Sequence, residues 1–340
     1  MKEQVTMEFP GLGIGEFTVN KVAFEFSLFG HPISVRWYGI IITVGIILAF
    51  AYAYYRSKQE KISVDDLLDL AIFVIIFGIL GARTYYVLTT LKDGIYHSFL
   101  DVIAIWNGGL AIYGGIIAGV LTIFLVCRKK KISFWKTTDM IAPGVMIGQI
   151  LGRWGNFFNG EAYGYKVAES SPLYFLRMGL LPNIDSSSRM YYYHPTFLYE
   201  SVWNLVGFLI INALYKRKKF DGQILFMYIS WYGFGRMFIE GLRTDSLYVG
   251  PFRISQVVGF ACFVFGTAMI IYNLVKVRKA KLAEGDYEAA YPQFKTEASM
   301  KGNEKKDSAE KNTDFEAIDS SDNSETSDKD KININRDNKE

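Results

Sequence analysis

The chain has 340 residues, of which 50% are apolar and 21% are charged, and its net charge is only +3. This composition excludes an ordinary soluble protein, and the basic residues occur in short groups between apolar runs, which excludes a nucleic-acid-binding surface. The two cysteines, Cys127 and Cys262, have no Cys-x-x-Cys spacing and no histidine nearby. We therefore expect no disulfide framework, no metal site and no cofactor.

Seven apolar runs are long enough to cross the hydrocarbon core of a bilayer, which is about 30 Å thick and takes about 20 helical residues. The residues before the first run lack the continuous apolar core of a cleavable signal peptide, so we expect the first span to direct insertion as well. Spans of this length exclude a β-barrel, whose strands have about 10 residues. The sequence therefore predicts an all-α polytopic membrane protein with seven transmembrane helices at residues 38–55, 67–91, 109–127, 136–157, 196–215, 222–241 and 254–275.

Lysine and arginine residues follow every second predicted span. They occur directly after the first, third, fifth and seventh spans, and the intervening connections contain far fewer of them for their length. The positive-inside rule then places the N-terminus outside and the C-terminus in the cytoplasm. The connections expected on the outer side are residues 92–108, 158–195 and 242–253.

The composition changes from about residue 283 onward. The remaining sequence is charged and rich in serine and asparagine, with almost no large aliphatic side chains. Such a segment buries too little apolar surface to offset the entropy of ordering it. We therefore expect a seven-helix membrane catalytic domain at residues 1–282 and a disordered charged cytoplasmic tail at residues 283–340.

The fourth span carries polar residues on one face near its outer end. Gln149, Arg153 and Asn156 are spaced i, i+4 and i+7, which places them on a single helical face. The polar and glycine residues that continue from the end of this span are Asn159, Gly160, Glu161 and Gly164.

The sixth span carries a second polar stripe. Charged side chains at membrane depth are costly and normally face a partner or a cavity. Local neutralisation of Arg236 by Glu240, or an interhelical hydrogen bond from Asn156, would explain either stripe alone. Two stripes that reach the same outer face favour a shared anion site, and planar guanidinium groups suit a phosphate such as a phospholipid headgroup. The residues of the second stripe, spaced i, i+4, i+8 and i+11, are Tyr232, Arg236, Glu240 and Arg243.

Five further residues lie in or near the outer halves of other spans. Tyr113 lies between paired glycines that favour close helix packing, and Arg83 in the second span is a charge that needs a partner. His194 and Glu200 add ionisable groups at the start of the fifth span, although a lone histidine there is more often a hydrogen-bonded surface group than a base. Tyr38 is either an interfacial aromatic anchor or part of the site.

Six motifs occur in order along residues 34–260. They are RWYG, GAR-x-x-Y, W-x-GGLAIYGG, GRWGNFFNGEAYG, HPTFLYE and YG-x-GR-x-x-IE-x-LR. Together they resemble the bacterial prolipoprotein diacylglyceryl transferase family, whose signature stretch is GR-x-GNF-x-NGE-x-x-G. The resemblance implies a plasma-membrane enzyme that transfers the diacylglyceryl group of phosphatidylglycerol to the lipobox cysteine of a prolipoprotein. A thioether forms and glycerol 1-phosphate is released, which is the first step of lipoprotein maturation.

The resemblance also implies roles for individual residues near the outer leaflet. Arg153 matches the signature arginine that binds the phosphatidylglycerol headgroup, and Arg236 with Glu240 matches an essential pair of the sixth span. Many family members have histidine where this chain has Tyr113, so a universal histidine base at this point is in question. The predicted catalytic residues are Tyr38, Tyr113, Arg153 and Arg236. The predicted substrate-binding residues are Arg153, Asn156, Asn159, Glu161, Gly164, His194, Glu240 and Arg243.

The expected reaction needs two kinds of assistance. Attack of a thiolate on the glyceryl carbon expels a phosphate leaving group, so the site must stabilise growing negative charge and promote loss of the thiol proton. Arginines from the two stripes suit the first role. For the second we expect positioning and electrostatics rather than one dedicated base. The groups that remain open as proton carriers are Tyr38, Tyr113, His194, Glu240 and the leaving phosphate.

Two other functions fit part of this pattern. An anion transporter or channel would use the arginines to line a permeation path, but it predicts a midplane site between internal repeats, and the two halves of the sequence show no convincing similarity. A noncatalytic lipid-binding scaffold would share every binding residue with the enzyme. The sequence alone therefore discriminates poorly between the scaffold and the enzyme.

Overall fold

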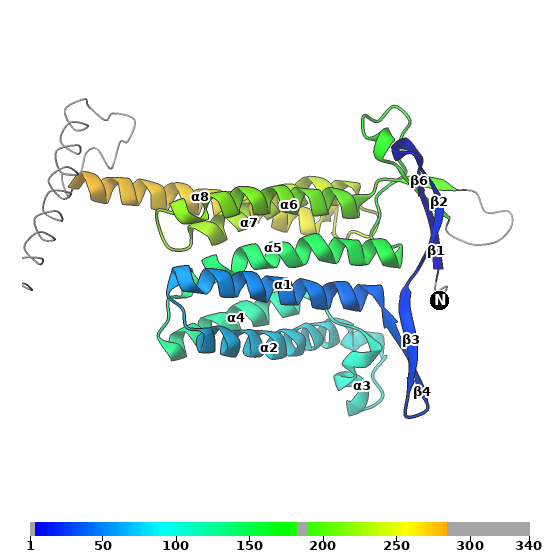
Figure 1. Ribbon diagram of the computed structural model, residues 1–340, viewed down its shortest axis with the longest axis horizontal. Helices are drawn as coiled ribbons and strands as arrows, with labels where there is room; N and C mark the ends of the chain where they lie inside the picture. The colour runs from blue at the N-terminus through cyan, green and yellow to red at the C-terminus, as the bar shows by residue number, and fades with distance from the viewer. Residues whose placement is uncertain (1–3, 182–189, 284–340) are drawn as a thin grey trace, which may run out of the picture. The chain divides into compact units, whose positions relative to one another are not determined.

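The computed structural model describes residues 4–181 and 190–283, and Figure 1 shows the chain as a ribbon. Residues up to 274 form one compact unit, and the described residues 275–283 belong to a second. The predicted cytoplasmic tail lies outside the described residues from residue 284 onward. Its disorder therefore stays a prediction.

Seven long helices in the described part of the chain cover the seven predicted spans. Four helical stretches are long and apolar enough, by length and composition alone, to cross a membrane: Trp37–Glu60, Ile112–Lys130, Thr196–Arg217 and Ile254–Ala283. The helical character of the other three predicted spans is also confirmed, and membrane crossing by all seven helices stays a prediction. The long helices are α1 (Trp37–Glu60), α2 (Val64–Thr90), α4 (Ile112–Lys130), α5 (Phe134–Asn159), α6 (Thr196–Leu214), α7 (Gln223–Ile239) and α8 (Ile254–Ala283).

Short connections with defined caps join the helices at one end. α1 and α4 both end at a lysine in the left-handed conformation, Lys61 and Lys131, each with φ of 57°. The next helices then begin at serine caps, where Ser63 accepts from the Asp66 amide at 3.1 Å and Ser133 accepts from the Lys136 amide at 3.4 Å. Connections this short force each pair of helices to run antiparallel.

The chain also contains short antiparallel strands, so the expectation of an all-α protein needs correction. The strands have two to seven residues and lie outside the predicted spans, where no apolar run is long enough to be detected as a span. One sheet has the order β2-β1-β5-β6, and β3 pairs only with β4, as β7 does with β8. The strands are β1 (Gln4–Phe9), β2 (Ile14–Asn20), β3 (Val22–Leu28), β4 (His31–Arg36), β5 (Met178–Leu181), β6 (Tyr191–Tyr193), β7 (Tyr248–Val249) and β8 (Phe252–Arg253). The remaining short helices are α3 (Phe99–Ile103), η1 (Pro10–Leu12), η2 (Leu91–Asp93), η3 (Ile105–Asn107), η4 (Tyr174–Leu176), η5 (Tyr215–Arg217) and η6 (Glu240–Leu242).

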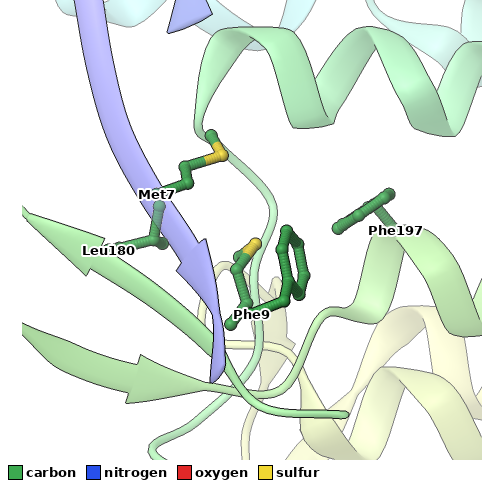
Figure 2. Close-up of a cluster of buried hydrophobic side chains, with 5 residues drawn as sticks. Met7, Phe9, Leu180 and Phe197 are labelled. Atoms are coloured by element: carbon green, nitrogen blue, oxygen red, sulfur yellow. The ribbon is translucent and has the colours of Figure 1, made fainter. Parts of the chain in front are cut away.

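The four-stranded sheet is seated on the helices by a small apolar core. Met7 and Phe9 of β1 and Leu180 of β5 form one buried apolar cluster with Phe197 in the first turn of α6, and Figure 2 shows Phe9 between the other two strand residues and Phe197. Burying each such side chain contributes about 1.5–3 kcal/mol. The core therefore fixes the sheet against the start of α6, directly beside the predicted polar motifs.

α5 is the central helix of the first unit. It packs against α1 on one side and against α6 and α7 on the other, as the ribbon also shows (Figure 1). Glycines allow the other close helix pair, α2 and α4, because a Cβ on Gly81 would lie 2.2 Å from the Cβ of Ala118. The predicted packing role of the third-span glycines is confirmed at Gly114, where a Cβ would lie 2.3 Å from the carbonyl oxygen of Gly81.

Arg83 finds its partners in the backbone of the connection between α2 and α4. Its guanidinium donates to the carbonyl oxygens of Asp101 at 2.6 Å, Val102 at 2.8 Å and Gly108 at 2.7 Å. The side chain is buried, and these carbonyls have no helical partner of their own. Arg83 therefore fastens the connection to α2 and has a structural role.

A buried ionic network connects the helices at the end where α1 ends and where α5 and α7 begin. Asp139 of α5 accepts from the Lys218 ammonium at 3.0 Å and from the amides of Gly222 and Leu225, at 2.9 and 3.0 Å, which caps the start of α7. Lys218 also donates to Glu60 at the end of α1, at 2.8 Å. One lysine of the predicted cytoplasmic basic group therefore joins α1 to α5, and Asp139 joins α5 to the start of α7.

Two tryptophans lock α6 to α7. The rings of Trp203 and Trp231 stack with centroids 4.4 Å apart, and each indole N–H donates to the other residue's carbonyl oxygen, at 3.0 and 2.9 Å. Glycines make room for the rings, since a Cβ on Gly207 would lie 2.2 Å from Trp231 Nε1. The pair lies about one helical turn from Glu200 on α6 and from Arg236 on α7, so it sets the spacing of these two side chains.

Gly207→Ala is expected to lower the free energy of unfolding by about 1–3 kcal/mol, because the added methyl displaces the Trp231 ring. Gly148→Ala is the matched control, since a Cβ there meets no atom within 4 Å. The control is expected to be neutral or to gain up to about 1 kcal/mol from helix propensity. The measurement is unfolding in detergent followed by tryptophan fluorescence, and equal midpoints for the two variants would contradict the packing argument.

Candidate functional site

Glu200 is the centre of a cluster of arginines. Its carboxylate lies in the second turn of α6 and is only 4% exposed. Oε2 contacts Arg153 Nη2 at 2.6 Å, while Oε1 accepts from Arg236 Nη1 at 2.6 Å and from Arg243 Nη1 at 3.2 Å. The three guanidiniums come from α5, from α7 and from the connection after η6. One buried carboxylate therefore holds three separate segments together.

Two further carboxylates complete the charge balance of the arginine cluster, by which we mean Arg153, Arg236 and Arg243 with Glu200. Glu240 Oε2 contacts Arg236 Nη2 at 2.5 Å, and Asp245 binds Arg243 through both oxygens, at 2.9 and 2.6 Å. The hydrogen bonds from Arg243 hold the pKa of the Asp245 carboxyl below its usual value. Glu240 and Asp245 bring the total to three carboxylates for three guanidiniums, so the cluster together with these two partners is close to electrically neutral.

The predicted amide residues extend the site from Arg153 toward solvent. Arg153 Nη1 donates to Asn156 Oδ1 at 3.2 Å, and Asn156 Nδ2 donates onward to Glu161 Oε1 at 3.0 Å. Asn159 Nδ2 reaches the same Glu161 oxygen at 3.1 Å. Gly160 ends α5 in the left-handed conformation, with φ of 62°, which turns Glu161 back toward the helix end. The Oδ1 atom of Asn159 is buried and has no hydrogen-bond partner within the described chain.

The three guanidiniums differ in how far solvent reaches them. The side chain of Arg153 is 21% exposed, compared with 14% for Arg236 and 10% for Arg243. An anion that approaches the cluster therefore meets Arg153 first.

Gly164 joins the segments that carry the cluster. A Cβ there would lie 2.7 Å from both the His194 Cβ and the Leu242 carbonyl oxygen. The Gly164 amide donates to the His194 carbonyl at 2.9 Å, and the next amide donates to the Leu242 carbonyl at 2.8 Å. Only glycine allows this approach, so the structure accounts for Gly164 through packing.

Three predicted site residues have partners outside the arginine cluster. The Tyr38 ring lies against α5, where a Cβ on Gly155 would be 2.7 Å from it, and the Tyr113 ring lies 6.5 Å from the ring of Tyr85. His194 Nδ1 is 3.2 Å from the Tyr199 hydroxyl. Burial lowers the pKa of His194, so this imidazole is neutral at pH 7. Within the described chain, no hydrogen bond or ion pair joins these three side chains to the cluster.

Glu200 is recognisable from the sequence as an ionisable group at the start of the fifth span, but it is not among the predicted site residues. Its role could have been inferred from the arginines. Glu240 lies four residues after Arg236 and neutralises it locally, whereas no carboxylate occurs at helical spacing from Arg153 within α5 near its outer end. Arg153 therefore requires a carboxylate from another helix, and Glu200 is the one that the fifth span provides.

Comparisons with known proteins match most of the chain. The family model for prolipoprotein diacylglyceryl transferase matches residues 23–272, a range that contains every residue of the site. A phosphatidylglycerol–prolipoprotein diacylglyceryl transferase of Listeria innocua is 42% identical over 270 residues, which is 78% of this chain and 94% of the relative. Proteins with the same name from Lysinibacillus sphaericus and Clostridium perfringens are also 42% identical, over 77% of this chain and 95% and 98% of their own lengths.

Glu200→Gln is expected to destabilise the fold by about 3–5 kcal/mol, because three neighbouring guanidiniums lose their shared counterion. Glu161→Gln is the matched control, since that carboxylate is exposed and accepts only from amides. Unfolding in detergent gives the difference between the two variants. If Glu200→Gln unfolds at the midpoint of the control, Glu200 does not hold the cluster together.

Proposed function

This chain belongs to the prolipoprotein diacylglyceryl transferase family, and from that premise we propose how its arginine cluster serves the transfer of a diacylglyceryl group from phosphatidylglycerol to a prolipoprotein. The observation that carries the proposal is the convergence of Arg153, Arg236 and Arg243 on the buried carboxylate of Glu200. We propose that this cluster binds the lipid phosphate and that the acceptor is the lipobox cysteine of the prolipoprotein.

The proposed topology has seven spans, with the cluster near the outer leaflet of the bacterial plasma membrane. The cluster forms where α5 and α7 end and where α6 begins, so these three helices meet at one end. The positive-inside pattern assigns that same end to the outside. The buried network of Asp139, Lys218 and Glu60 then lies at the cytoplasmic end, beside the basic connections.

Arg153 is the proposed first contact of the phosphate. Its side chain is the most exposed of the three arginines, and its planar guanidinium suits a phosphate. Because the cluster together with Glu240 and Asp245 is close to neutral, one phosphodiester brings a single extra negative charge, and the guanidiniums that bind it remain paired with carboxylates. Asn156, Asn159 and Glu161 suit the hydroxyl groups of the glycerol headgroup, and Asn159 Oδ1 supports this assignment because this acceptor has no hydrogen-bond partner among the described residues.

The chemical step exchanges one bond to the lipid for another. The cysteine sulfur forms a bond to the terminal glyceryl carbon, and the bond between that carbon and the phosphate oxygen breaks. The electron pair of the broken bond goes to the phosphate, which leaves as glycerol 1-phosphate with additional negative charge. Guanidiniums held in place before the reaction stabilise this charge without further reorganisation.

The thiol proton is proposed to leave through the electrostatics of the site and to end on the released phosphate. Glu240 is buried and paired with Arg236, and His194 faces Tyr199, so neither is placed as a free base beside the phosphate. The arginines favour the thiolate, because a nearby positive charge lowers a thiol pKa. This proposal uses no cysteine of the enzyme, in agreement with the apolar surroundings of Cys127.

The proposed function is tested with purified protein, phosphatidylglycerol vesicles and a lipobox peptide. The expected product is a peptide whose cysteine has gained one diacylglyceryl group, together with free glycerol phosphate. A peptide with serine in place of cysteine, and vesicles of phosphatidylcholine, are the controls. Tight binding of phosphatidylglycerol without transfer, under conditions in which a verified relative is active, would favour the scaffold, and phosphate flux across sealed vesicles would favour a transporter.

Arg153→Lys is expected to reduce transfer on the order of 10²-fold, because lysine keeps the charge but loses the planar pair of donors. Arg128→Lys is the matched control. Arg128 is exposed at the C-terminal end of α4, so this variant is expected to leave transfer unchanged. Initial rates with the lipobox peptide provide the measurement. Equal rates for the two variants would contradict the phosphate-clamp role of Arg153.

Tyr113→Phe tests whether the Tyr113 hydroxyl acts as a general base for the thiol proton or whether the electrostatics of the site suffice. Loss of a general base reduces rates by about 10²–10⁴-fold, whereas we expect this variant to lose less than about 10-fold. The expectation follows because, within the described chain, no hydrogen bond joins the Tyr113 hydroxyl to the cluster, and its ring lies 6.5 Å from that of Tyr85. A loss within the general-base range, with unchanged unfolding, would return the Tyr113 hydroxyl to the mechanism.

A further inference from the structure

The β3–β4 hairpin has two chemically different faces. Phe24 pairs with Val35 and Phe26 pairs with Ile33 across the hairpin. Residues directly opposite one another in an antiparallel pair point to the same side of the sheet, so these four side chains share one face. The rings of Phe24 and Phe26 stack on it with centroids 6.2 Å apart. We call this the aromatic face of the hairpin.

The other face of the hairpin is polar. Glu25 lies opposite Ser34, and the Ser34 hydroxyl donates to the Glu25 carboxylate at 2.8 Å. Ser27, the next residue on this face, is exposed. The sequence FEFS therefore alternates strictly between the two faces, as a strand at a boundary between apolar and polar surroundings does.

No part of the described chain covers the aromatic face. β3 and β4 pair only with each other, and the exposed fractions are 54% for Phe24, 44% for Phe26 and 94% for Phe29 at the turn. An isolated two-stranded hairpin is only marginally stable in water. A hairpin that exposes several aromatic rings would therefore be stabilised by an apolar surface outside the described chain.

The hairpin is attached to the end of a helix that is apolar enough to cross a membrane. β4 ends at Arg36 and α1 begins at Trp37, whose amide donates to the Lys21 carbonyl at 3.1 Å and so ties both strands to the start of the helix. The Trp37 ring stacks on Phe158 of α5, with centroids 5.3 Å apart. Figure 1 shows the hairpin running across the ends of the helices rather than along them.

A second exposed aromatic group lies at the same end of the helices. It is carried by the connection between α2 and α4, where α3 also lies (Figure 1). The exposed fractions are 77% for Phe99, 65% for Leu100 and 73% for Trp106. Two independent segments therefore present aromatic side chains at the depth where α1 and α4 begin and α2 ends.

We propose that the β3–β4 hairpin lies flat in the outer leaflet, with its aromatic face inserted among the lipids at the headgroup boundary and its polar face in water. The occupant is the lipid surface because the hairpin leads directly into α1, a helix apolar enough to cross a membrane and with exposed apolar side chains, and aromatic rings are favoured at membrane interfaces. This inference rests on the proposed outer location of the N-terminus. It adds a lipid contact outside the arginine cluster.

The test compares neighbouring positions of one strand. Phe26→Cys and Ser27→Cys variants are labelled with an environment-sensitive fluorophore and placed in nanodiscs of phosphatidylcholine and phosphatidylglycerol. The signal of the unmodified chain, from Cys127 and Cys262, is subtracted. Quenching is measured with lipid carrying a spin label near the headgroup and, separately, with iodide in water. Ile33→Cys and Ser34→Cys repeat the comparison on β4, in case one variant fails to fold.

The label at position 26 is expected to be quenched severalfold more by the spin-labelled lipid than the label at position 27, with the order reversed for iodide. Equal access of iodide to both positions would place the aromatic face in water and overturn the proposal. Protection of position 26 from both quenchers would mean that protein covers the face, which also overturns it.

The transfer assay on the same variants separates this inference from the proposed function. Lipid quenching at position 26 in a protein without transfer activity would contradict the function and leave the hairpin assignment intact. Transfer activity together with iodide access at position 26 would contradict only the hairpin assignment.

Discussion

The structure depends on one constraint: guanidinium groups cannot be collected beside a bilayer unless a carboxylate lies between them. Two unit charges 4 Å apart repel by about 4 kcal/mol near a protein surface, which exceeds the gain from an exposed ion pair, about 0–1 kcal/mol. Glu200 meets this constraint because it is buried and its two oxygens face three guanidiniums. The positions of Arg153, Arg236 and Arg243 therefore follow from where α6 places a single side chain. The packing of α5, α6 and α7 places the Glu200 side chain between the three guanidiniums.

Several contacts fix the positions of the segments that carry Glu200 and its arginine partners. The stacked pair of Trp203 and Trp231 joins α6 to α7 next to the cluster, and the apolar core around Phe197 seats the start of α6 under the sheet. Gly164 lets the connection after α5 approach both α6 and the end of α7. Because these supports are rigid, the positive charges are arranged before any lipid arrives, which is the property that lowers the cost of stabilising a leaving phosphate.

Much of the helical part of the fold could be predicted from the sequence, because a span must be a long uninterrupted apolar run and such runs are visible without any tertiary information. The two polar stripes were visible for the same reason, since Arg153 and Arg236 stand out in apolar helices. Glu200 was harder to assign, because its partners come from other helices and its spacing within α6 contains no trace of them. The strands were missed because they are short, although the alternation around Phe26 followed by Gly30 is a hairpin signal in the sequence. In the structure, Phe29 and Gly30 form the turn with φ of 49° and 81°.

The most direct test of the central claim is the distance between the arginine cluster and a lipid phosphate. Protein with ¹⁵N-labelled guanidinium groups, reconstituted in phosphatidylglycerol bilayers, allows ¹⁵N–³¹P dipolar recoupling by solid-state NMR. If the lipid phosphate binds at the arginine cluster, guanidiniums within hydrogen-bonding distance of phosphorus give a recoupled signal. Part of this signal is expected to disappear in the Arg153→Lys protein. A spectrum that is identical with and without the Arg153 guanidinium would show that the phosphate does not bind there, which would contradict the proposed phosphate site.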